Sequence, residues 1–194
     1  MVHDTVQQHW LLLIYRVPQD PPGRRTYVWR QLKALGAIYL QQAVGLLPDQ
    51  LAVRAALETL ADRIRAFEGD VSLLETHSPS VEWEQEMIRR FNQARDAEFL
   101  EVIENVERFE DEIARESQRG KYTFAELEDS EADWEKIERW LARIDARDFF
   151  TAPGRAGVVA ALERGRARLE QFAAAVYAHE GVQDDNGHAE TEHH

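Results

Sequence analysis

The fold is decided by residues 10–48, which run WLLLIYRVPQDPPGRRTYVWRQLKALGAIYLQQAVGLLP. The stretch opens with a continuous apolar segment, residues 10–17, and such a segment predicts a strand buried on both faces. Three prolines and a glycine follow within residues 18–23, and they predict a stiff loop. Apolar residues with helical spacing then predict a helix over residues 24–35, which Gly36 ends.

After this helix, the pattern predicts strand, helix and strand in turn. Residues 37–47 have strand character, as one strand or two, with a bulge or tight bend at Gly45. An amphipathic helix is predicted over residues 50–67 and a last strand over residues 71–76. This order of elements predicts an α+β fold, a ferredoxin-like α/β sandwich, as a first domain at residues 1–78.

The second half is predicted to be helical, as a domain at residues 79–180. A long amphipathic helix is expected at residues 81–118, then a short helical turn from residue 123. Two more amphipathic helices are expected at residues 130–148 and 155–179. Each needs a partner for its apolar face, so a helical hairpin or three-helix unit is predicted, and the long helix is a candidate homodimer interface. Residues 181–194, polar and containing histidine, are predicted to be a disordered tail.

The composition bounds the class of protein. The chain has 194 residues, 44% of them hydrophobic, a net charge of −13 and no cysteine. Disulfides and thiolate metal sites are therefore excluded. No apolar run approaches the roughly 20 residues of a membrane helix, so no membrane partner and a cytoplasmic location are expected.

The charge is unevenly distributed. Residues 1–78 carry 8 basic and 8 acidic side chains, whereas residues 79–194 carry 15 and 28. The basic residues of the first stretch are concentrated around the predicted loop and first helix, where only Asp20 opposes them; they are Arg16, Arg24, Arg25, Arg30 and Lys33. Arginine at a helix N-terminus suits phosphate or a tetrahedral oxyanion, so these five residues form the candidate DNA- or oxyanion-binding site. The alternative is that they are a solvated face or pair with the acidic helices.

No motif supports catalysis. The sequence has no G-x-S-x-G, P-loop, G-x-G-x-x-G or H-E-x-x-H pattern, so neither an enzyme nor a cofactor is predicted. His188, His193 and His194 with nearby carboxylates could hold a metal only weakly, and no metal site is predicted. The five tryptophans are interpreted as core or interface anchors.

Three segments resemble the N-terminal domain of the ChrB family of chromate-resistance regulatory proteins. They are WLLLIYRVP with the following RRTYVWRQLKALGA, then IYLQQAVGLLP, and RGKYTFAELEDSEADWEKIERWLARIDARDFFTAPGR. The first half also resembles, more distantly, the ferredoxin-like domain of PaaX-type repressors. The resemblance spans roughly residues 10–180, without the C-terminal domain of full-length members.

The resemblance implies a cytoplasmic regulator that binds promoter DNA of a chromate-efflux operon and responds to chromate. Arg16, Arg24, Arg25, Arg30 and Lys33 match the basic positions expected to contact DNA. Two alternatives stay open: an interaction module that acts with a separate ChrB C-terminal domain, and a protein that binds chromate or sulfate as an oxyanion.

Overall fold

The computed structural model describes residues 8–20 and 22–189. Its contacts divide the chain into two units. The first contains the residues up to Ala94 together with Arg147–Thr151, and the second contains Arg95–Ala146 and the residues from Ala152. The boundary lies inside the long third helix, because that helix begins against the sheet and continues among other helices.

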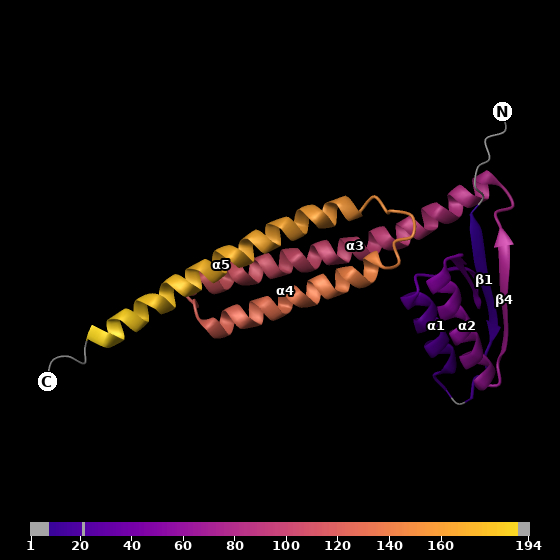
Figure 1. The fold of residues 1–194 in the computed structure, drawn as a ribbon, viewed down its shortest axis with the longest axis horizontal. Helices are drawn as coiled ribbons and strands as arrows, with labels where there is room; N and C mark the ends of the chain where they lie inside the picture. Colours follow the sequence, from indigo (N-terminus) through magenta and orange to yellow (C-terminus); the bar gives the residue numbers. More distant parts are fainter. Residues whose placement is uncertain (1–7, 21, 190–194) are drawn as a thin grey trace. The chain divides into compact units, whose positions relative to one another are not determined.

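The first unit is built around a four-stranded antiparallel sheet with strand order β2-β3-β1-β4. Figure 1 shows helices α1 and α2 next to β1 and β4. Along the chain the elements are β1 (His9–Arg16), α1 (Arg24–Ala34), β2 (Ile38–Gln41), β3 (Val44–Pro48), α2 (Leu51–Ala66) and β4 (Asp70–His77). The predicted order of strands and helices is confirmed, and so is the α+β class.

The strand β1 is apolar from Trp10 to Tyr15, and side chains on both of its faces are buried, although Ile14 is exposed. Leu11, Leu13 and Tyr15 pack into a core with residues of α1 and α2. The alternate residue Trp10 packs on the other side of the sheet with Met87 and other apolar side chains. This alternation follows from the two-residue repeat of a strand.

Two strands, rather than one, occupy residues 37–47. They are joined by a turn in which Ala43 has a φ of 63°, the left-handed region that few non-glycine residues adopt. The predicted bend at Gly45 is wrong, since Gly45 pairs with Leu13 and Tyr39 inside β3. The irregularity of pairing lies instead between Tyr39 and Gln41.

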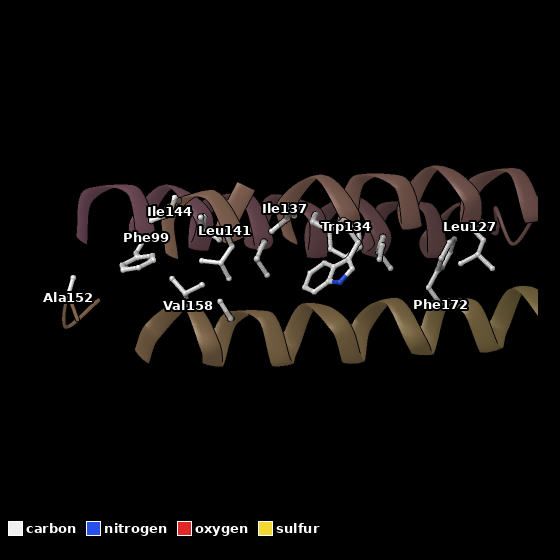
Figure 2. Packing of buried hydrophobic residues seen from close by; sticks show 14 of the residues in the cluster. Phe99, Leu127, Trp134, Ile137, Leu141, Ile144, Ala152, Val158 and Phe172 are labelled. Atoms are coloured by element: carbon white, nitrogen blue, oxygen red, sulfur yellow. The ribbon is translucent and has the colours of Figure 1, made fainter. Parts of the chain in front are cut away.

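The described residues of the second unit form three helices, which confirms the three-helix form of the helical prediction. They are α3 (Val81–Gln118) from Arg95 onward, α4 (Phe124–Asp145) and α5 (Arg155–Ala189). Figure 2 shows side chains of α4 and α5 pointing toward one another, among them Trp134, Val158 and Phe172. The apolar stripe of α3 is buried in the same core, and the predicted homodimer stays a prediction.

The fourth helix is one element where two were predicted. Thr123 caps it, since its Oγ1 accepts a hydrogen bond from the backbone N–H of Glu126 at 3.3 Å. Ser130 was expected to start a separate helix, but it lies buried in the middle of α4. The short helical turn expected from residue 123 and the helix expected from residue 130 are therefore one continuous helix.

The polar tail predicted at residues 181–194 lies partly outside the described part of the chain. The helix α5 extends to Ala189, and residues 190–194 are not described. None of the described helices is long and apolar enough to cross a membrane.

Candidate functional site

The candidate site is centred on α1, which begins after the proline-rich loop. Gly23 precedes the helix with a φ of 99°, and no side chain caps the first N–H groups. The first turn contains no acidic residue, and it starts with Arg24 and Arg25. Free N–H groups and nearby arginines make this end of the helix favourable for negative charge.

The five predicted basic residues do not converge on one point. Arg24 lies on the flank near α2, where its Nη1 donates hydrogen bonds to the carbonyl oxygens of Phe67 at 2.9 Å and Asp20 at 3.3 Å. Its guanidinium carbon also lies 5.4 Å from the centroid of the Phe67 ring. These contacts make Arg24 a connection between the loop, α1 and the end of α2.

Arg25 and Lys33 lie along the opposite flank of α1 together with Trp29, since the three are four residues apart. The ammonium of Lys33 is 5.3 Å from the centroid of the Trp29 ring, which is a cation–π distance. Arg30 is exposed beside them. Arg16 ends β1, opposite Asp70 in the strand register, and is exposed.

Ion pairs within the first unit do not account for this basic cluster. None of the five residues forms an ion pair with a residue in the described part of the chain. Another arginine of the same unit is paired. Arg54 contacts both Glu75 and Asp49, and hydrogen bonds with these carboxylates raise its pKa. Within the first unit, the described carboxylates therefore do not neutralise the cluster.

Beside Arg25 lies a cavity of about 350 Å³, which we call the aromatic cavity. Residues of β1, α1, β2 and the β2–β3 turn line it: Tyr15, Arg25, Thr26, Trp29, Tyr39, Gln41, Gln42 and Ala43. A second hollow of about 480 Å³, the loop hollow, shares four of them and adds Arg16, Val17, Pro18, Gln19 and Gly23. No aspartate or glutamate is among the described residues that line either space. In a chain with a net charge of −13, this local absence of carboxylates favours anions.

Two tyrosine hydroxyls meet at the aromatic cavity. The hydroxyl oxygens of Tyr15 and Tyr39 are 3.3 Å apart. Burial, and next the hydrogen bond with Tyr15, raise the pKa of Tyr39 well above its usual value. The Tyr39 hydroxyl therefore keeps its proton near pH 7, and a hydrogen bond between the two hydroxyls uses only one hydroxyl proton.

The sequence did not predict the aromatic residues of this cavity. Trp29 was interpreted as an anchor in the core or an interface, yet 46% of its surface is exposed. The sequence did contain a signal for the exposure of Trp29. Val28 and Leu32 mark the buried face of α1, and Trp29 lies beside that face and not on it. Tyr15 and Tyr39 are 24 residues apart, and only the sheet brings them together.

The structure gives no candidate metal centre among its described side chains. No group of three or more histidine, aspartate or glutamate residues there could hold a metal ion. The histidines of the tail, His188, His193 and His194, lie outside the residues whose side chains are described.

Two comparisons with known proteins give the same family. Residues 25–183 match the family model described as "Protein ChrB, N-terminal". A segment of 92 residues is 35% identical to Protein ChrB of Cupriavidus metallidurans, and it covers 47% of this chain and 28% of that relative's length. The chain thus spans a little over a quarter of the curated relative it matches. Because the model covers most of both units, the chain belongs to the family of ChrB N-terminal regions.

Proposed function

We propose that this chain is a regulatory protein of chromate resistance that binds promoter DNA of a chromate-efflux operon. Membership of the ChrB family supports the link to chromate. The observation that carries DNA binding is the group of exposed cations on α1, Arg25, Arg30 and Lys33, which have no carboxylate partner among the described residues. We further propose that the first unit is ferredoxin-like, which its β-α-β-β-α-β order and its sheet order support.

Binding of DNA by this chain requires a local surface of positive charge. A protein with a net charge of −13 is repelled by DNA at long range, so any contact with phosphates depends on a basic surface that is not neutralised. Exposed arginine and lysine side chains supply that contact by displacing counterions from the phosphates. Arg24 is excluded from this role in our proposal, because its guanidinium is already engaged with Phe67 and Asp20.

A gel-shift titration with the operon's own promoter tests the proposal at low salt. The variant Arg30→Ala with Lys33→Ala removes two exposed cations that lie outside both hollows. We expect it to weaken binding at least about tenfold, as the loss of two phosphate contacts would.

The matched control is Lys136→Ala with Arg139→Ala on α4, which removes two exposed cations that pair with Asp133 and Glu135. It should leave the affinity nearly unchanged. Absence of any retarded complex at low salt, or equal weakening by the two double variants, would reject DNA binding by α1.

The loop hollow favours oxyanion binding as a second candidate function. Arg16 and Arg25 both line it, with Gly23 at the start of α1, and none of its described lining residues is a carboxylate. Chromate should then raise the melting temperature, and sulfate should compete with it, because both are tetrahedral dianions. Arg16→Gln should abolish the shift; a shift that survives this change would place the anion elsewhere.

A further inference from the structure

We propose that the aromatic cavity is a binding site for a small aromatic anion, a planar ring of one or two fused rings that carries a carboxylate. Three aromatic side chains from three different elements line the cavity: Tyr15 of β1, Trp29 of α1 and Tyr39 of β2. One charged residue, Arg25, lines the same space. The volume of about 350 Å³ is at the lower end of the range of ligand pockets, which suits a small molecule.

The charge of the ligand follows from what the cavity lacks. A cluster of tyrosine and tryptophan can hold a cation over its rings, and such aromatic cages recognise alkylammonium groups. Here, however, the charged residue that lines the cavity is an arginine, and none of its described lining residues is acidic. A cation would be repelled by Arg25, whereas a carboxylate can accept a charge-assisted hydrogen bond from it.

The polar groups of the cavity fit the edge of such a ligand. The Tyr15–Tyr39 pair leaves one hydroxyl proton free to donate, and Thr26, Gln41 and Gln42 add further hydrogen-bonding groups. Flat aromatic faces and a few convergent polar groups are what orient a planar ligand.

The backbone at the cavity is held in an unusual conformation. Ala43 adopts a left-handed φ of 63°, and its carbonyl oxygen accepts a hydrogen bond from the Tyr15 N–H at 3.0 Å. This bond fixes the β2–β3 turn against β1, so that Gln42 and Ala43 line the space beside Arg25. Such backbone strain is often found where a site is shaped for a ligand.

Calorimetric titration of the full chain with naphthoate tests the inference. Three further probes separate its parts: naphthalenemethanol has the ring without the charge, cyclohexanecarboxylate has the charge without the ring, and choline is a cation. We expect naphthoate to bind at least about tenfold more tightly than each of the other three. Equal binding of choline, or no naphthoate binding stronger than about 10 mM, would overturn the proposal.

Two variants locate the site. Trp29→Ala should weaken naphthoate binding about tenfold, and Arg25→Gln should remove the preference for naphthoate over naphthalenemethanol. Both side chains are exposed, so neither change should unfold the protein. Matched controls are Tyr177→Ala, an aromatic residue of α5 that is 63% exposed, and Arg139→Gln on α4; both should bind as the wild type does.

Displacement by simple anions distinguishes this site from the loop hollow. Sulfate should displace naphthoate only weakly, because it offers no ring to the three aromatic side chains. Two results would show that the aromatic cavity is not the binding site. One is complete displacement of bound naphthoate by an equal concentration of sulfate; the other is an unchanged naphthoate affinity in Trp29→Ala. Arg25→Gln also removes one of the three cations proposed to meet DNA, so naphthoate binding is measured without DNA, and its outcome does not depend on whether DNA binds.

Discussion

At the scale of single residues, neighbours in the basic cluster have different roles. Arg24 and Arg25 are adjacent in the sequence, but a helix turns them by about 100° relative to each other. Arg24 is thereby directed to Phe67 and the loop, and Arg25 to the two hollows. The sequence could locate the cluster, but it could not separate the structural arginine from those free to bind a partner.

The role of Arg24 leads to a prediction about stability. Arg24→Ala removes the hydrogen bond to the Phe67 carbonyl and the contact with the Phe67 ring, so it should lower the free energy of unfolding by about 1–2 kcal/mol. Arg30→Ala, an exposed change on the same helix, should shift it by less than about 0.5 kcal/mol. Urea unfolding measures both, and equal effects of the two variants would contradict the structural role of Arg24.

At the scale of elements, patterns within one segment were predictable and contacts between segments were not. The helical period of Val28 and Leu32 indicated their burial correctly. The apolar run of β1 indicated burial of one face correctly, but on the other face Ile14 is 40% exposed. The turn at Ala43 was missed because alanine carries no signal for a positive φ. The aromatic cavity was missed for another reason: it forms only when the β2–β3 hairpin is placed beside α1 by the sheet.

The connection between α3 and α4 has a pH dependence that can be tested. Burial, and next the hydrogen bond with Glu126, raise the pKa of Glu116 above its usual value. The folded state then holds this proton after the unfolded state has lost it, so stability falls as the pH rises from about 4.5 through the folded-state pKa. Glu126 has the opposite effect on stability at lower pH. Its hydrogen bond with Lys121 lowers its pKa, so the stability that its charged form contributes is lost as the pH falls below about 4.5.

Glu116→Gln should remove the loss of stability above pH 4.5. Relative to the wild type, the variant should gain roughly 0.5–1 kcal/mol at pH 7 and little or nothing near pH 4. Urea unfolding across this range measures the difference, with Glu107→Gln, an exposed change on the same helix, as control. A gain that is constant with pH would show that the carboxyl of Glu116 is not responsible.

At the scale of the whole molecule, the uneven charge limits how DNA can be bound. Only three exposed cations of α1 are proposed to meet phosphates, so the logarithm of the affinity should fall with the logarithm of salt with a slope of about −2.7 per protomer. Between about 50 and 200 mM salt this corresponds to a loss of about 40-fold. Fluorescence anisotropy at several salt concentrations measures the slope, and a value near −6 would require cations outside α1.

The surface proposed to meet DNA is α1, and chemical-shift mapping locates that surface residue by residue. Promoter DNA is added to ¹⁵N-labelled protein, and the backbone amide resonances are followed. We expect the largest shifts on residues Arg24–Ala34, with the helices α4 and α5 little affected. Shifts concentrated on α4 or α5, or no shifts at low salt, would contradict it.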